Sequence, residues 1–266
     1  MSFLQEMTYL APMKTKQKHL LLGTVIGTIL FLIIQYMTPL SKQKPPPPPD
    51  ATRPQVARWE KLDWANALLQ NKDVNSNEFN VFIRAFKQEE ILEIWAKSRT
   101  NTSFTKLIEY PFCANSGTLG PKRKEGDRQI PEGFYHVNVF NPKSNFHLSL
   151  GINYPNKADL KHADPQQPGS DIYIHGGCQT VGCIPLTNDK IKEVYLLAEL
   201  AKQSGQERIP VHIFPVKMTV KNLEKISAKY PQHNAFWQEL QVGYLYFENG
   251  NQLPKMDIDE NGKYIF

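Results

Sequence analysis

The sequence predicts a mainly β domain with helices packed on it, an α+β fold, and two patterns support this prediction. Between residues 79 and 175 the chain contains short runs rich in β-branched and aromatic residues, which are typical of strands. From Thr187 onward, apolar residues recur every three to four positions, which is typical of amphipathic helices. A chain of 266 residues can hold one domain with a substantial core together with appendages.

The predicted strands are separated by residues that favour turns. Residues 87–90 are polar and lie between the first two runs, as in a hairpin. Pro131 and Gly133 precede the fourth run, where they would end one element and begin another. The predicted strands are 79–86, 91–95, 106–112, 134–140, 146–151, 171–175 and 211–215.

Helices are predicted before and after this strand-rich region. Residues 54–70 mix Trp59 and several leucines with polar residues, which indicates a short helix or a capping segment. Thr187 is a suitable N-cap for a helix that follows it, and residues 220–230 predict another helix. Near the C-terminus, Asn261 and Gly262 favour a two-residue hairpin turn.

An uncharged apolar stretch lies near the N-terminus. Residues 19–41 contain no Asp, Glu, Lys or Arg, and about 20 apolar residues suffice for a helix to cross a bilayer. Because no small-x-small cleavage motif follows, an uncleaved anchor is favoured over a signal peptide. We therefore expect a cytoplasmic tail at 1–18 and a transmembrane signal anchor at 19–40.

The segment after the anchor predicts a spacer and then a folded domain. Residues 45–49 are five consecutive prolines, which favour a stiff polyproline II conformation. We expect a Pro-rich linker at 41–53 and the domain at 54–266. Since the tail is short and three Lys precede the span against two after it, the domain is expected on the far side of the membrane.

The charge distribution argues against nucleic-acid binding. The formal net charge is +5, but residues 1–49 hold five Lys and one Glu, so they account for +4 of it and the rest carries +1. A nucleic-acid-binding domain concentrates its basic residues on the folded part. We therefore expect no nucleic-acid partner.

The most informative segment joins a histidine to a cysteine. Residues 174–185 read IHGGCQTVGCIP, and the thiolate is the reactive form of a cysteine, which a neighbouring imidazole can stabilise as an ion pair. We predict Cys183 as a nucleophile and His175 as its base. The Gly176 carbonyl would orient the imidazole, and the Cys183 amide N–H, after Gly182, would be an oxyanion donor.

Other interpretations of these residues exist. Taken singly, such a His or Cys is more often structural than catalytic. His175, Cys178 and Cys183 also have the chemistry of zinc ligands, but no good fourth ligand lies nearby, and we expect no metal or other cofactor. Three cysteines are an odd number; a Cys113–Cys178 pair would leave Cys183 free, although the sequence leaves the pairing open.

These residues and their neighbours resemble the active-site signature of the YkuD-type L,D-transpeptidases, in which His-Gly is followed by Ser/Thr-x-Gly-Cys. The corresponding elements are His175-Gly176 and Thr180-Val181-Gly182-Cys183. The resemblance is strongest over residues 79–250 and is closest to the YafK-like branch. It extends to the segments 116–135, 146–156 and 187–195.

This resemblance implies an L,D-transpeptidase β-sandwich and a catalytic domain at 54–266 that acts on peptidoglycan stem peptides in the bacterial periplasm. Cys183 would attack the carbonyl of the third-position diamino acid, and His175 would move the proton. Gly182 and Thr180 would lie at the oxyanion and substrate site. The acyl acceptor would be an amine (transpeptidase) or water (amidase or endopeptidase), and an envelope protein attached to peptidoglycan is a possible partner. A non-catalytic, anchored peptidoglycan-binding module is the alternative.

Two departures from the family pattern concern the site. Only seven residues separate His175 from Cys183, which predicts a reduced or displaced lid. Many members have an Arg two residues after the Cys, where this chain has Pro185. Arg128, or Arg123 in the same basic loop, is a candidate to bind a substrate carboxylate instead; the plainer interpretation of that loop is a solvated turn.

Overall fold

The computed structural model describes residues 44–266. The predicted tail at 1–18 and anchor at 19–40 lie outside the described residues and stay predictions. Within 44–266, no helix combines the length and the apolar character that a membrane crossing needs. Residues 44–52 form no helix or strand, and helix α2 (Arg53–Gln70) begins directly after them.

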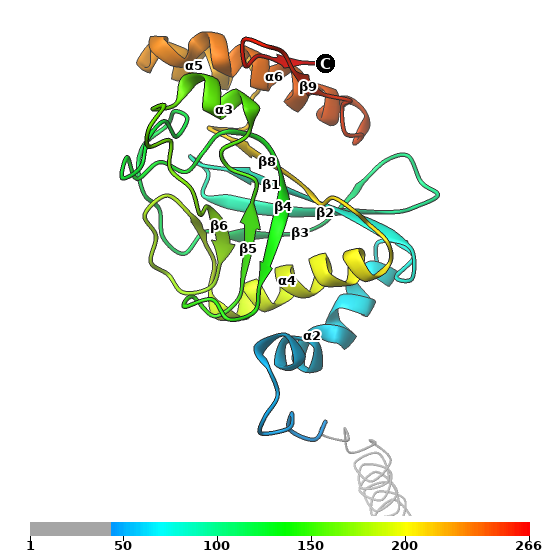
Figure 1. The fold of residues 1–266 in the computed structure, drawn as a ribbon. Coiled ribbons are helices and arrows are strands. Elements are labelled where there is room, and N and C mark those ends of the chain that lie inside the picture. The colour runs from blue at the N-terminus through cyan, green and yellow to red at the C-terminus, as the bar shows by residue number, and fades with distance from the viewer. Residues whose placement is uncertain (1–43) are drawn as a thin grey trace, which may run out of the picture. The chain divides into compact units, whose positions relative to one another are not determined.

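The eight main strands form one connected, curled sheet (Figure 1). The α+β class is confirmed, and the sheet bends at β4, which belongs to both of its halves, β3-β2-β1-β8-β4 and β4-β5-β6-β7. The first half of β4 pairs with β8 and its second half with β5, with a register shift between Val137 and Val139. The sheet order is β3-β2-β1-β8-β4-β5-β6-β7, and the strands are β1 (Phe79–Phe86), β2 (Ile91–Ser98), β3 (Thr105–Pro111), β4 (Gly133–Asn141), β5 (Ser149–Ile152), β6 (Tyr173–His175), β7 (Ile184–Pro185) and β8 (Pro210–Phe214).

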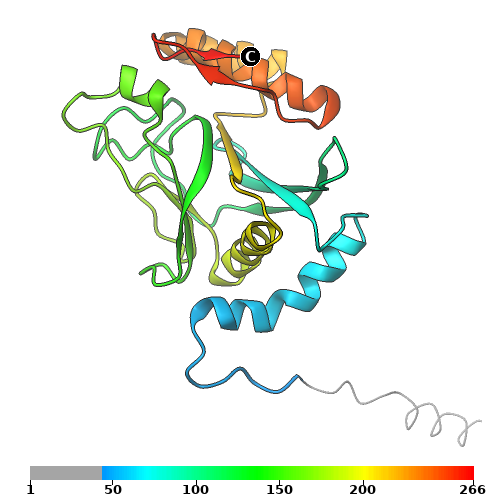
Figure 2. The ribbon, with the colours of Figure 1, turned by 45° about the vertical axis from the view of Figure 1, so that its right-hand side comes forward.

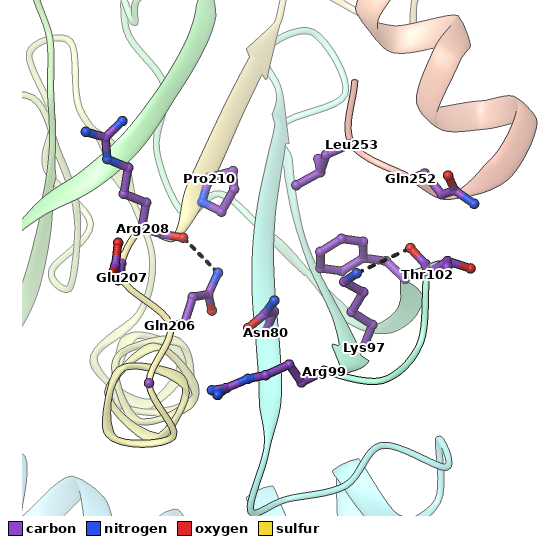
Figure 3. A pocket seen from close by; sticks show the side chains of 12 residues that line it. Asn80, Lys97, Arg99, Thr102, Gln206, Glu207, Arg208, Pro210, Gln252 and Leu253 are labelled. Atoms are coloured by element: carbon purple, nitrogen blue, oxygen red, sulfur yellow. Dashed lines mark hydrogen bonds between the residues drawn. The ribbon is translucent and has the colours of Figure 1, made fainter. Parts of the chain in front are cut away.

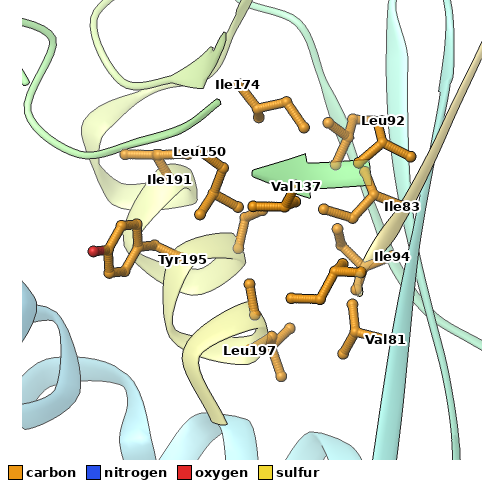
Figure 4. Packing of buried hydrophobic residues seen from close by; sticks show 14 of the residues in the cluster. Val81, Ile83, Leu92, Ile94, Val137, Leu150, Ile174, Ile191, Tyr195 and Leu197 are labelled. Carbon is orange, nitrogen blue, oxygen red and sulfur yellow. The ribbon is translucent and has the colours of Figure 1, made fainter. Parts of the chain in front are cut away.

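Helix α4 (Asn188–Gln203) lies against one face of this sheet and contributes to the main core (Figure 4). The Thr187 side chain accepts a hydrogen bond from Lys190 N, which confirms the predicted N-cap. Side chains from both halves of the sheet, such as Ile83 and Leu150, are buried in the same cluster. The two halves therefore share one hydrophobic core.

A second layer covers the opposite face of the sheet and is built from C-terminal elements (Figure 1 and Figure 2). Phe86, Phe134 and Phe214 point to this side and pack with Trp237 in a second buried cluster, because successive side chains of a strand face opposite ways. The layer comprises α5 (Val220–Lys229), the 3₁₀ helix η1 (Pro231–His233), α6 (Asn234–Gly250) and the strands β9 (Asp257–Ile258) and β10 (Tyr264–Ile265). Of these, α6 is not among the elements predicted from the sequence.

Three local predictions are corrected by the backbone. The strand predicted to begin at 146 begins at Ser149, and the strand predicted to begin at 171 begins at Tyr173. In both cases a residue with positive φ, His147 or Asp171, breaks the extended run. The C-terminal hairpin is present, but Asp259 N bonds Lys263 O, so its turn is longer than two residues. A short helix, α3 (Lys157–His162), lies between β5 and β6.

Candidate active site

The two residues predicted to carry the chemistry lie on neighbouring strands. His175 ends β6 and Cys183 immediately precedes β7. These strands pair in parallel, with Ile174 opposite Ile184 and His175 opposite Pro185. Both isoleucines are buried in the main core. Because side chains alternate along a strand and partners across a pair share a face, His175 and Cys183 lie together on the opposite face.

The His175 imidazole is held in one tautomer. The side chain is 2% exposed, and its Nδ1 lies 2.6 Å from the Gly176 carbonyl oxygen. A carbonyl only accepts hydrogen bonds, so Nδ1 carries the proton and Nε2 keeps its lone pair. The Phe146 ring lies 4.7 Å from the imidazole, centroid to centroid. Burial lowers the pKa of His175, while the Gly176 carbonyl acts in the opposite direction; the neutral, basic form is thus favoured.

Gly176 is required for this arrangement by the space around it. A Cβ at this position would lie 2.9 Å from the Phe146 carbonyl oxygen and 2.8 Å from Asn188 Oδ1, so a side chain would force the backbone away. The Gly176 N–H donates to Leu148 O at 3.1 Å. The residue that orients the imidazole is therefore itself fixed between β5 and α4.

Cys183 is the free cysteine of the chain and is half-buried. Its Sγ accepts a hydrogen bond from Tyr173 N at 3.4 Å and donates to Asp171 O at 3.6 Å. Burial raises the pKa of the thiol, the Tyr173 N–H and the Lys122 ammonium lower it, and Asp171 raises it. Together these influences raise the pKa of the Cys183 thiol above its ordinary value.

The surroundings of the two groups disfavour the predicted thiolate–imidazolium ion pair. The pKa of the Cys183 thiol is raised and that of His175 is lowered, both chiefly by burial. The described contacts of Sγ are backbone groups, and no hydrogen bond joins it to the imidazole. Burial penalises both charged forms, so these surroundings favour a neutral thiol and a neutral imidazole.

The predicted oxyanion donor is also occupied. The Cys183 N–H donates to Thr180 Oγ1 at 2.9 Å, and the Thr180 hydroxyl donates to Cys183 O at 2.8 Å. The Gly182 N–H donates to Ser116 Oγ at 2.8 Å. Both amides are thus satisfied by side-chain hydroxyls, and an oxyanion would have to compete with those hydroxyls for them. Ser116 was not among the predicted site residues, because its partner lies 66 positions away.

A disulfide fixes the loop between the two catalytic candidates. Cys178, inside the 176–182 loop, is bonded to Cys113 just after β3. The Cys113 N–H also donates to Pro185 O at 3.1 Å. This pairing leaves Cys183 free and removes Cys178 as a zinc ligand, so the zinc interpretation of the motif is wrong. Within residues 44–266 no cluster of His, Cys, Asp and Glu suited to a metal is found.

The basic loop at 122–128 acts on Cys183 through a residue other than the predicted ones. Arg128 is exposed and has positive φ, and the Arg123 guanidinium lies over the Phe236 ring of the C-terminal layer. Lys122 instead is 3% exposed, bonded to Asp127 at 2.8 Å, and its charge lowers the pKa of Cys183. Next to this loop, the Gln129 carbonyl oxygen packs within 2.8 Å of the Cβ position of Gly182.

A cavity of about 670 Å³ lies away from Cys183 and His175, at the start of β1 and β8 and the end of β2 (Figure 3). Three basic residues line it, but they do not converge. The Lys97 ammonium bonds the Asn101 carbonyl at 2.8 Å, the Arg99 guanidinium bonds the Ser204 carbonyl, and Arg208 points away from both (Figure 3). This cavity brings together no nucleophile and base.

The fold and this site define a family, and comparison with known proteins identifies it. The model of the YkuD family, the L,D-transpeptidase catalytic domain, matches residues 80–213. The chain belongs to this family. It is 35% identical over 187 residues to the protein named "Putative L,D-transpeptidase YafK" of Escherichia coli strain K12, a match that covers 70% of this chain and 73% of the relative.

Solved structures with related folds were also found. The helical cell shape determining protein Pgp2 of Campylobacter jejuni has a TM-score of 0.41 and 16% sequence identity, covering 74% of this chain and 80% of that chain. Bdellovibrio bacteriovorus Bd1075 has a TM-score of 0.36 and 26% identity, covering 52% of this chain and 48% of that chain. These likenesses are too distant to bear on the site.

Proposed function

We propose that the chain is a cysteine acyltransferase that acts on peptidoglycan stem peptides, the substrates of its family, with Cys183 as nucleophile and His175 as base. One observation carries this proposal. A free thiol and a buried imidazole lie on the same face of the adjacent strands β6 and β7, and the bond from Nδ1 to Gly176 O leaves Nε2 of that imidazole able to take a proton.

The proposed reaction has two balanced steps. As Sγ bonds to the carbonyl carbon of the third-position diamino acid, His175 Nε2 takes the thiol proton. The imidazolium then protonates the leaving amine as the C–N bond breaks, which yields a thioester on Cys183. In the second step an amine or water attacks the thioester, gives its proton to His175, and the thiolate leaves and is reprotonated by the imidazolium.

The neutral resting pair fits a mechanism in which the thiolate forms only with substrate in place. The thiol must turn from the Asp171 carbonyl toward the imidazole, and such bonds are often formed only in the substrate complex. A developing oxyanion would take the Cys183 N–H from the Thr180 hydroxyl, and then the Gly182 N–H from Ser116. The Lys122 ammonium would favour the negative charge. Arg128, exposed beside this loop, is a weaker candidate for contact with a substrate carboxylate.

Hydrolysis is the second candidate function, and one feature favours it. The loop between His175 and Cys183 has seven residues and is pinned by the Cys113–Cys178 bond, which fits a reduced lid over the half-buried sulfur. A thioester there would be open to water, which would make the chain an amidase or endopeptidase that cleaves peptidoglycan cross-links or peptidoglycan–protein links. A non-catalytic, anchored peptidoglycan-binding module is the third possibility.

The location of the enzyme is part of the proposal. With an anchor at 19–40, the chain would be a single-pass protein of the bacterial inner membrane with its catalytic domain in the periplasm. The disulfide supports this, because such bonds persist in oxidising compartments. An envelope protein attached to peptidoglycan would then be within reach as a partner.

The deciding experiment incubates purified sacculi with the full chain and identifies the products by mass spectrometry. New cross-links support the transferase, and released fragments support the hydrolase. Cys183→Ala and His175→Gln should abolish either reaction, while Lys124→Met, on the exposed side of the basic loop, serves as a matched control. An unchanged sacculus with the native chain, or activity that survives in Cys183→Ala, would overturn the proposed mechanism.

A further inference from the structure

Helix α2 contacts a loop of the candidate site through the side chain of Arg53. Arg53, the first residue of α2, donates from Nη1 to the Ser144 carbonyl and to the His147 carbonyl at 2.6 Å. Both carbonyls belong to the 142–148 loop between β4 and β5. One guanidinium thus holds two points of that loop, three residues apart. Helix α2 precedes residues 80–213, the part of the chain that the family model matches.

The loop that Arg53 holds carries the aromatic ring that covers His175. Phe146 lies between the two bonded carbonyls, and its ring centroid is 4.7 Å from that of the imidazole. Its N–H donates to Ser144 Oγ at 3.1 Å. His147 has a φ of +69°, a left-handed conformation that a non-glycine residue holds only where its surroundings impose it.

The same loop also touches the residue that orients the imidazole. The Phe146 carbonyl oxygen would lie 2.9 Å from a Cβ at Gly176, so the loop backbone approaches Gly176 closely. The Phe146 side chain is 42% exposed although the His175 side chain beneath it is 2% exposed. Phe146 therefore covers the imidazole from a partly exposed position on the loop.

The rest of α2 is attached to α4 independently of this loop. Arg58 pairs with Glu199 at 2.8 Å, Lys61 pairs with Glu193 at 2.9 Å, and Ala65 is fully buried. Removing one of these ion pairs would weaken the helix–helix contact without touching the 142–148 loop. The chain therefore offers a matched control for Arg53 on the same helix.

We propose that Arg53 is a positioning residue for His175 and acts through Phe146. This inference rests on the proposed function for its catalytic consequence, but not for its structural one. By bonding the carbonyls on either side of Phe146, Arg53 keeps the ring on the imidazole, excludes water from it and limits its rotation. Arg53 is also the residue at which the segment 44–52 enters helix α2.

The structural test measures how accessible His175 is in the full chain. Diethyl pyrocarbonate acylates neutral imidazoles, and peptide mass spectrometry separates His175 from the other six histidines. Arg53→Ala should speed the modification of His175 several-fold, Arg53→Lys should restore much of the protection, and Arg58→Ala should match the native chain. Phe146→Ala should speed the modification of His175 at least as much as Arg53→Ala does. The Arg53→Ala/Phe146→Ala double variant should be modified at the same rate as Phe146→Ala alone.

The catalytic test follows kcat/KM on muropeptides against pH for the same variants. Arg53→Ala should lower kcat/KM about tenfold, since small displacements of a catalytic group cost up to about a hundredfold. The acid limb of the kcat/KM profile of Arg53→Ala should move to higher pH. Burial lowers the pKa of His175 in the native chain, so uncovering the imidazole should raise that pKa. A merely structural role would give Arg58→Ala the same shift.

The outcomes separate this inference from the proposed function. Equal His175 modification in Arg53→Ala and the native chain, or additive effects of Arg53→Ala and Phe146→Ala, would overturn the inference while leaving Cys183 chemistry intact. If the native chain has no activity on sacculi but His175 protection depends on Arg53 through Phe146, the proposed function fails and the positioning contact stands.

Discussion

The two halves of the curled sheet are held together by different means. In the half β3-β2-β1-β8 the strands are five to eight residues long, and β1 is buried along almost its whole length. In the half β5-β6-β7 the strands have four, three and two residues. The long half is stabilised by its ladders and by apolar packing on both faces.

The short half gains its rigidity from side chains instead. The 176–182 loop is fixed by the Cys113–Cys178 bond, by the Thr180 hydroxyl on Cys183 and by the Ser116 hydroxyl on Gly182. The short strands supply few ladder bonds, so the loop depends on these few side-chain contacts. The comparison indicates that changes in the long half should alter stability, whereas changes in the short half should also alter chemistry.

The largest stability effect is expected from the core of the long half. Ile83 is fully buried in β1, so Ile83→Ala should lower the free energy of unfolding by about 2–5 kcal/mol through lost burial and a residual cavity. Well below the melting temperature, the rate at which iodoacetamide alkylates Cys183 should be unchanged. Denaturant unfolding measures the free energy of unfolding, and intact-mass spectrometry follows the alkylation of Cys183. A parallel loss of reactivity would show that the halves are not separable.

The disulfide should affect both the free energy of unfolding and the activity. Replacing Cys113 and Cys178 together by Ala opens a bond with a sequence separation of 65, and we expect a loss of about 2–4 kcal/mol of unfolding free energy. Because Cys178 lies between His175 and Cys183, kcat/KM should fall as well. Urea unfolding and muropeptide turnover test this, and native chain treated with reductant is the matched control. Full activity in the variant would mean that the loop keeps its geometry without the bond.

Much of this fold was predictable because its strands have local signatures. The run 79–86 was predicted with the bounds of β1, and Thr187 was predicted as the cap of α4, since β-branched runs and capping residues act through near neighbours. The His175–Gly176 contact was predictable for the same reason, as it spans one residue. Helix α6 was missed, although it packs Trp237 into the second core.

The surroundings of the site were less predictable because they depend on contacts between distant segments. Ser116 meets Gly182, Phe146 meets His175 and Arg53 meets His147, and none of these pairs leaves a periodic or spaced pattern in the sequence. Whether the predicted ion pair forms was not predictable from the sequence for a related reason. Its charge state depends on burial, which arises only when the whole sheet has folded.

The Ser116 hydroxyl offers a smaller and more local test of the short half. Ser116→Ala removes the acceptor of the buried Gly182 N–H, and an unsatisfied buried donor costs about 1–3 kcal/mol. We expect a loss of stability in that range and a change in kcat rather than KM, because the freed amide lies beside the nucleophile. Ser227→Ala, which removes a hydroxyl in the C-terminal layer, is the control. Equal kinetics for both variants would contradict a role for Ser116 at the site.

The smallest effect is expected from the charge of Lys122 and appears in the pH dependence. Burial raises the pKa of the Cys183 thiol, and only the thiolate reacts. The alkylation rate of the native chain should therefore keep rising at pH values where an ordinary thiol has reached its plateau. Lys122 lowers the same pKa, so Lys122→Met should move the rise to still higher pH and slow alkylation at neutral pH.

The loop should keep its shape in Lys122→Met, because the Asp127 carboxylate would still accept hydrogen bonds from the backbone N–H groups of Arg123, Lys124 and Gln129. Lys124→Met removes an exposed charge of that loop, and superimposed profiles for the two variants would show that the buried ammonium has no special influence on the sulfur.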